Sequence, residues 1–78
     1  MVKVYSISEC PWCKKVKAYL NSKNVLFTDI DVETDAAGRQ ALAKLSPEMT
    51  VPVLEIDGRV IIGFDKGQID AALKLGTQ

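Results

Sequence analysis

The sequence predicts an α/β domain with the element order βαβαββα, in which a four-stranded mixed sheet is flanked by three helices that cover both faces. The first three predicted elements form a βαβ unit, which implies two parallel strands joined by a right-handed crossover. An Asp-Gly pair between two later apolar runs predicts an antiparallel hairpin. With 78 residues, of which 47% are hydrophobic, the chain is expected to form a single domain over residues 1–78.

The N-terminal half contains the predicted βαβ unit. Residues 2–7, VKVYSI, are rich in β-branched and aromatic side chains, which is typical of a strand. A helix is expected over residues 11–23, because Pro11 suits the first helical turn and Asn24 suits a left-handed C-terminal stop. Residues 25–32, VLFTDIDV, predict the second strand.

A second helix is expected after this strand. It would begin at an N-cap formed by Thr34 or Asp35 and end at Leu45, although Gly38 lowers the helical propensity of the segment. The following stretch, SPEMTVP, is rich in residues typical of loops.

The remaining elements are a hairpin and a last helix. The apolar runs VLEI and VII flank the Asp-Gly pair at residues 57–58, which favours a two-residue turn. Asp65 and Gln68 resemble a capping box, so the last helix is expected to begin there, to run through Leu75 and to end at Gly76.

Charge and hydropathy restrict the expected partners and compartment. Lys and Arg number 10 and Asp and Glu number 10, and this zero net charge argues against nucleic acid or an anionic membrane as the main partner. No signal-peptide core is visible, and no apolar run approaches the roughly 20 residues that span a bilayer. We therefore expect a cytoplasmic protein, in a compartment where thiols are kept reduced.

The segment SECPWCKK contains both cysteines of the chain, Cys10 and Cys13, and three interpretations apply to them. A structural zinc site needs four Cys or His ligands, and the chain has two cysteines and no histidine. A purely structural disulfide across so short a loop removes little entropy from the unfolded chain. A redox-active pair at the start of a helix is favoured for Cys-x-x-Cys beside a βαβ pattern.

The predicted helix gives the two cysteines different surroundings. Cys10 is expected at the N-cap, where unpaired backbone N–H groups and the helix dipole favour a thiolate. Cys13 falls on the apolar stripe with Val16 and Leu20, so it should be less exposed and able to attack a mixed disulfide on Cys10. Lys14 either adds positive charge beside Cys10 or is a solvated surface lysine.

The two residues between the cysteines also bear on the site. Pro11 removes an N–H and stiffens the turn. Trp12 is expected to be exposed beside the nucleophile, and burial in the core is the alternative.

Three motifs in order resemble the glutaredoxins of the thioredoxin superfamily. CPWC after the first strand resembles the family's Cys-Pro-aromatic-Cys site, TVPV at residues 50–53 resembles its Thr-Val-Pro loop, and GFD at residues 63–65 resembles its glycine-containing turn into the last helix. The resemblance covers the whole chain and implies the thioredoxin-like fold.

The resemblance also implies a substrate groove. Thr50, Val51 and Pro52 would form a loop with a cis proline across from Cys10, where the Val51 backbone would pair with an extended thiol substrate. The alternative is that this segment simply begins an edge strand. Gly63, Phe64 and Asp65 would present backbone N–H groups to a carboxylate, with Asp65 also serving as a helix cap. The resemblance thus adds these residues to Cys10, Pro11, Trp12, Cys13 and Lys14.

Departures from the family pattern concern the reductant. Glutaredoxins commonly have a lysine three residues before the first cysteine, where this chain has Ile7, and the turn reads Gly63-Phe64-Asp65-Lys66 instead of carrying paired Gly and Asp. The turn is closer to redoxins that take electrons from thioredoxin reductase, such as the donors for ribonucleotide reductase. The expected electron source is therefore a flavoprotein of the thioredoxin-reductase type, with glutathione as the alternative.

The expected function is reduction of protein or small-molecule disulfides by a dithiol oxidoreductase. The protein would be a monomer without a bound cofactor, with Cys10 as nucleophile, Cys13 as resolving thiol and a redox-active Cys10–Cys13 disulfide. Its partners would be disulfide-containing proteins, ribonucleotide reductase among the candidates, and its reductant. The alternative is a carrier in which two subunits hold an iron–sulfur cluster through Cys10 and external thiols.

Overall fold

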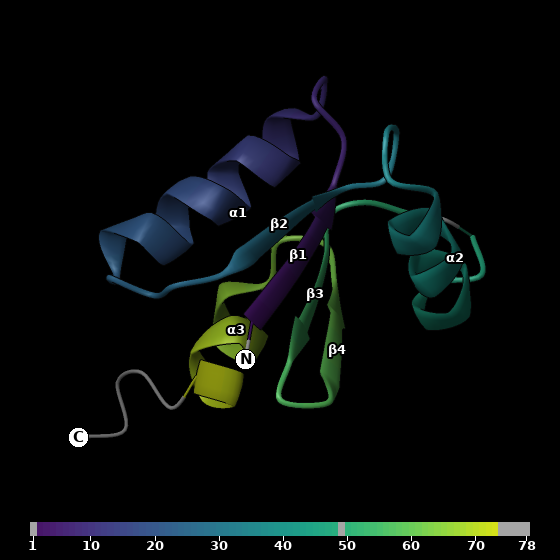
Figure 1. Cartoon of the computed structure of the whole chain (residues 1–78). Helices are drawn as coiled ribbons and strands as arrows, with labels where there is room; N and C mark the ends of the chain where they lie inside the picture. Colours follow the sequence, from purple (N-terminus) through teal and green to yellow (C-terminus); the bar gives the residue numbers. More distant parts are fainter. Residues whose placement is uncertain (1, 49, 74–78) are drawn as a thin grey trace.

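The computed structural model describes residues 2–48 and 50–73 of the chain, and it has the predicted element order and the four-stranded mixed sheet (Figure 1). The elements are β1 (Val2–Ser6), α1 (Pro11–Ser22), β2 (Thr28–Asp31), α2 (Ala36–Leu45), β3 (Val53–Ile56), β4 (Arg59–Ile62) and α3 (Lys66–Leu73).

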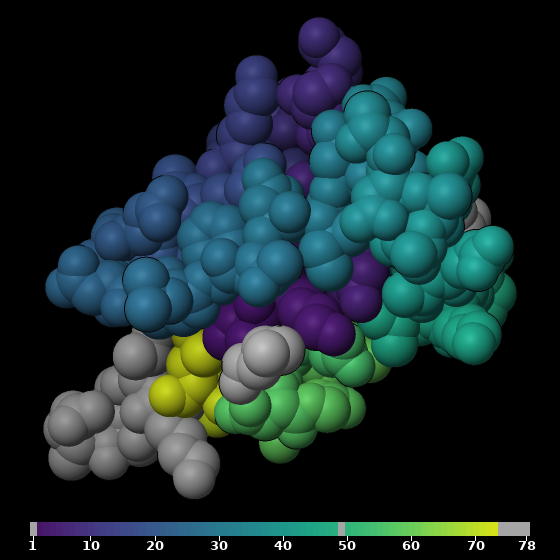
Figure 2. All heavy atoms as spheres, viewed as in Figure 1, coloured from purple at the N-terminus to yellow at the C-terminus, as the bar shows by residue number. Residues whose placement is uncertain are grey.

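The sheet has the strand order β2-β1-β3-β4, with β1 parallel to β2 and antiparallel to β3. Helices α1 and α3 cover one face and α2 covers the other (Figure 1). Successive side chains of a strand point to opposite faces, so Val4 packs with the cluster under α1 and α3 while Tyr5 packs with the cluster under α2. β1 is therefore covered on both faces, and in the space-filling view its purple atoms appear only in a gap between neighbouring elements (Figure 2).

The cluster under α1 and α3 is the larger of the two. Val16 and Leu20 of α1 and Ile69 of α3 are fully buried in it. The strands contribute a further set of buried aliphatic side chains, namely Val2, Val4, Leu54, Ile56 and Ile61. Because α1 is anchored along its length by this cluster, its N-terminus is held at a defined place beside the ends of β1 and β3.

The second strand is shorter than the sequence predicts. The expected strand covers residues 25–32, whereas β2 begins at Thr28. The Val25 N–H donates to the Leu20 carbonyl at 3.0 Å, which continues the turn at the end of α1. Val25 and Phe27 still pack against the core, so their hydrophobicity reflects burial beneath the turn rather than strand pairing.

The predicted caps and turns have the expected backbone geometry. Asn24 adopts a left-handed conformation with φ of 59°, and the α2 N-cap is Asp35, whose carboxylate accepts the Gly38 N–H at 2.9 Å. Asp57 and Gly58 both have positive φ, as a type I′ hairpin turn requires. Other boundaries shift by one residue, and the predicted end of the last helix at residues 75–76 lies outside the described residues.

Within residues 2–48 and 50–73, no helix combines the length and the apolar character needed to cross a bilayer.

Candidate functional site

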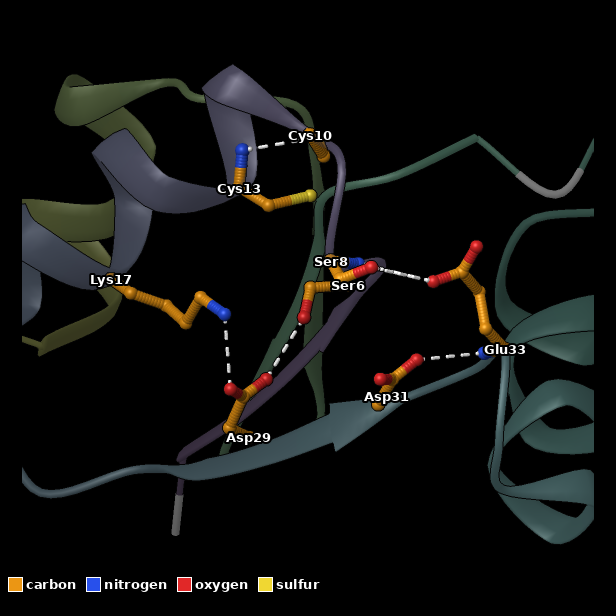
Figure 3. A network of polar contacts seen from close by, with 8 residues as sticks. All are labelled: Ser6, Ser8, Cys10, Cys13, Lys17, Asp29, Asp31 and Glu33. Atoms are coloured by element: carbon orange, nitrogen blue, oxygen red, sulfur yellow. Dashed lines mark hydrogen bonds and ion pairs between the residues drawn. The ribbon is translucent and has the colours of Figure 1, made fainter.

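Cys10 is the N-cap of α1, as the sequence predicts. Its backbone is extended, with φ of −126° and ψ of 106°, and its Sγ accepts the Cys13 N–H at 3.1 Å (Figure 3). This N–H is one of the donors that the first turn of a helix leaves without a backbone partner. The donor and the positive end of the helix dipole both favour negative charge on the Cys10 sulfur.

Cys13 lies one turn inside α1 and is fully buried, whereas Cys10 is 8% exposed. Burial, reinforced by the hydrogen bond with the Cys10 side chain, raises the pKa of Cys13 to about 11, while a backbone hydrogen bond with Ile7 and the charge of Lys17 act in the opposite direction. Cys13 therefore carries a proton at neutral pH. The two free thiols are chemically distinct although they sit three residues apart.

The loop that leads into α1 is tied to the end of β2. The Ser8 backbone N–H and hydroxyl both donate to the Glu33 carboxylate, at 3.2 and 3.0 Å, and the Glu33 N–H donates to the Asp31 carboxylate at 2.9 Å (Figure 3). These contacts hold the segment immediately before Cys10. Sequence reasoning missed the two Ser8–Glu33 contacts because they join residues 25 positions apart.

Five of the residues that the sequence singles out line one open groove of about 280 Å³ in the described part of the chain: Trp12, Val51, Pro52, Gly63 and Phe64. The Val51–Pro52 peptide bond is cis, as the resemblance implies. The Gly63 N–H donates to the Pro52 carbonyl at 2.8 Å, and this bond joins the loop before β3 to the turn after β4. Trp12 is 56% exposed, so the prediction of an exposed side chain is confirmed and the alternative of burial in the core is not.

The other predicted site residues lie around this groove. Pro11, Lys14 and Thr50 are exposed and do not contribute to its lining within the described residues. Asp65 caps α3, since its carboxylate accepts the backbone N–H and the side-chain amide N–H of Gln68. These bonds lower the pKa of Asp65 below its ordinary value, so the carboxylate is charged at neutral pH.

An aromatic series extends the groove along α1. The Phe64 ring lies 6.4 Å from the Trp12 ring and 5.7 Å from the Tyr19 ring, and the Tyr19 hydroxyl donates to Asp70 of α3. Lysine ammonium groups lie over these rings, Lys15 over Trp12 and Lys66 over both Tyr19 and Phe64. Tyr19 was not predicted as a site residue, although its position seven residues after Trp12 places both on one helix face.

Within the described residues, no group of three or more Cys, His, Asp or Glu side chains is arranged to hold a metal ion. A cluster bound through Cys10 would need ligands from other molecules.

Comparisons with known proteins agree with this geometry. The family model described as Glutaredoxin matches residues 2–61. A glutaredoxin-like 8.6 kDa protein of the rubredoxin operon of Clostridium pasteurianum is 47% identical over 95% of this chain and 99% of its own length. Glutaredoxin 3 of Escherichia coli is 36% identical over 94% of this chain and 96% of its own length.

Solved structures agree at the level of the fold. The crystal structure of a mutant of a thioredoxin-like protein superposes with a TM-score of 0.84 at 33% identity, covering 95% of each chain. The fold, the family model and the near full-length relatives lead to one conclusion. This chain is a member of the glutaredoxin family, within the thioredoxin superfamily.

Proposed function

We propose that this glutaredoxin-like redox protein reduces disulfides through a dithiol mechanism in which Cys10 and Cys13 have separate roles. The observation that carries the proposal is the difference between the two thiols. Cys10 is at the N-cap with a backbone N–H directed at its sulfur, and Cys13 is fully buried with its pKa raised to about 11. One thiol is thus suited to attack first, and the other is suited to remain protonated until it is needed.

The proposed reaction has two exchange steps. The Cys10 thiolate attacks one sulfur of the substrate disulfide, so a Cys10–substrate bond forms and the substrate's second sulfur leaves as a thiolate. Cys13 then loses its proton and attacks the Cys10 sulfur, which forms the Cys10–Cys13 disulfide and releases the remaining substrate thiolate. The substrate gains two electrons, the Cys10–Cys13 pair loses two, and the departing thiolates take up protons from solvent.

The groove beside Cys10 would receive the substrate. Val51 lines the groove, where its backbone could pair with an extended segment that carries the disulfide. Trp12 and Phe64 add exposed and half-exposed aromatic surface to the lining. This mostly apolar lining favours a protein segment as substrate over a small charged molecule.

For the reductant, we propose a flavoprotein of the thioredoxin-reductase type in preference to glutathione. Ile7, at the position where the family commonly has a lysine, packs against the core cluster under α2 and brings no cation to the groove. Lys66, a possible substitute, has its ammonium over the Tyr19 and Phe64 rings. The backbone N–H groups of Phe64 and Asp65 remain as one subsite for a carboxylate.

Single-cysteine variants test the assignment of roles. Cys13→Ser should react with a disulfide substrate and stop at a mixed disulfide on Cys10, which intact-protein mass spectrometry detects. Cys10→Ser should form no adduct and reduce no substrate. Adduct formation at Cys13 in the Cys10→Ser protein, at a rate equal to that of Cys10 in the wild type, would reverse the roles. A brown protein with visible absorbance after anaerobic purification would instead favour the iron–sulfur carrier.

A further inference from the structure

Lys17 is held on the inner side of α1 by one partner from the sheet, Asp29, which is itself bonded to Ser6. Its ammonium lies 3.0 Å from one oxygen of Asp29 on β2. The other Asp29 oxygen accepts the hydroxyl of Ser6, the last residue of β1, at 2.9 Å (Figure 3). Ser6 is almost fully buried, and the Lys17 side chain is only 25% exposed. The ammonium is therefore held beside the sheet, although the Asp29 side chain of the pair is 45% exposed.

This cation is next to the resolving cysteine. Lys17 follows Cys13 by four residues, so the two side chains are neighbours on one helix face. In Figure 3 the Cys13 side chain points to the same side of α1 as the Lys17 side chain, which extends to Asp29. The Lys17 charge lowers the pKa of Cys13, against the larger effect of burial.

Few charged groups act on Cys13 in the described structure. On its own helix these are Cys10, whose negative charge raises the pKa of Cys13, and Lys17, which lowers it. From the sheet, β1 presents the uncharged Ser6 hydroxyl and β2 presents Asp29, which is paired with Lys17. When Cys10 is in a mixed disulfide its thiolate charge is gone, and Lys17 is then the charged neighbour on α1 that acts on Cys13.

We propose that Lys17, anchored by Asp29, is a positioning residue for the resolving step, in which its ammonium stabilises the Cys13 thiolate that attacks the mixed disulfide. The inference rests on the dithiol function proposed above. The Cys13 proton passes to water, the Cys10–Cys13 bond forms as the Cys10–substrate bond breaks, and the substrate sulfur leaves with the electron pair of that bond. Lys17 itself transfers no proton and forms no bond.

The test is a single-turnover reaction of the reduced protein with an aromatic disulfide that releases a coloured thiolate at each step. Attack by Cys10 releases the first thiolate, and resolution by Cys13 releases the second, so stopped-flow absorbance separates the two. Lys17→Met should slow the second phase about threefold to tenfold at neutral pH and leave the first phase unchanged, because a higher pKa lowers the thiolate fraction of Cys13. Lys17→Arg should retain the wild-type rate, and the control Lys44→Met, on the exposed face of α2, should match the wild type.

The salt dependence of the second phase separates an electrostatic role from a purely structural one. The gap between wild type and Lys17→Met should narrow at high salt, which screens the charge of a partly exposed lysine. The proposal would be overturned if the second phase of Lys17→Met had the wild-type rate. It would also be overturned if both phases slowed equally at every pH and salt concentration. The assay needs only a small disulfide, so failure to reduce proteins with a biological reductant would count against the proposed function without affecting this result.

Discussion

At the scale of single residues, the site depends on where two identical side chains fall relative to the start of one helix. Cys10 precedes the first helical residue, so its sulfur meets an unpaired N–H, whereas Cys13 is turned into the core between α1 and the sheet. Position within the helix, and not a difference in residue type, makes one thiol suited to attack and the other suited to stay protonated.

Alkylation should therefore discriminate between the cysteines in a pH-dependent way. The raised pKa of Cys13, about 11, keeps its thiol protonated below that value, and its thiolate fraction rises about tenfold for each pH unit on the way up. Brief treatment of the reduced protein with iodoacetamide at pH ~6 to 8 should modify Cys10 alone, as peptide mapping would show.

Cys13 should become modified only as the pH approaches the value of its pKa or when the protein is unfolded. Denatured protein is the matched control, in which both cysteines should react at similar rates. Equal labelling of Cys10 and Cys13 in the folded protein at pH ~7 would contradict the assignment.

At the scale of elements, the close approach of α2 to the sheet explains a glycine that the sequence alone makes look unfavourable. Gly38 lies inside α2 and is buried, and a Cβ atom added there would lie 2.4 Å from Cγ2 of Ile30 on β2. Real Cβ contacts are not this short, and the Ile30 methyl group is on a stiff β-branched side chain. The glycine thus sets the distance between α2 and β2.

Gly38→Ala should destabilise the protein by up to about 2 kcal/mol, because overpacking costs about 1–3 kcal/mol and the gain in helix propensity is only about 1 kcal/mol. Urea denaturation followed by circular dichroism measures the free energy of unfolding. Gly67→Ala, within α3, is the matched control, since its added Cβ would make only an ordinary contact of 3.5 Å with the Asp65 carboxylate.

A double-mutant cycle of Gly38→Ala with Ile30→Ala tests whether the clash with Ile30 causes the loss of stability. With the Ile30 methyl groups removed, Gly38→Ala should cost markedly less than in the wild type. An equally large cost in both backgrounds would mean that contact with Ile30 is not the reason for glycine at this position.

At the scale of the whole molecule, residues from three separate segments assemble the groove. The start of α1 contributes Trp12, the loop before β3 contributes Val51 and Pro52, and the turn after β4 contributes Gly63 and Phe64. Ile7, in the segment before α1, lies in the cluster under α2 and adds no charge to the groove. The proposed preference for one reductant therefore rests on the assembled surface.

Ile7→Lys should raise turnover with glutathione about tenfold, since a charge-assisted contact to a carboxylate contributes about 1.5–3 kcal/mol when well formed. The measurement is NADPH oxidation with one disulfide substrate, coupled to glutathione and glutathione reductase or to thioredoxin reductase. Ile7→Met is the uncharged control and should behave like the wild type. Faster turnover of the unmodified protein with glutathione than with thioredoxin reductase would defeat the proposed preference.

The fold class and element order follow from local pattern, because strand and helix periodicity, caps and turn residues each act within a few positions. Asn24, Asp35 and the Asp-Gly turn at residues 57–58 have the backbone conformations expected from their side chains. Family motifs supplied the residues of the groove, which periodicity does not indicate. The second strand was predicted too long, since a hydrophobic residue beneath a turn has the same sequence signature as one in a strand.

By itself, the sequence determined where α1 and α2 begin and end to within one residue, and through Pro11 and the cysteine spacing it placed Cys10 at an N-cap and Cys13 on the buried stripe. The tertiary structure alone decided which distant side chains meet these thiols. Ser6, Asp29 and Lys17 come together because β1 and β2 pair in parallel beneath α1, a register that no local propensity contains. Packing across the sheet sets such contacts, and the role proposed for Lys17 depends on them.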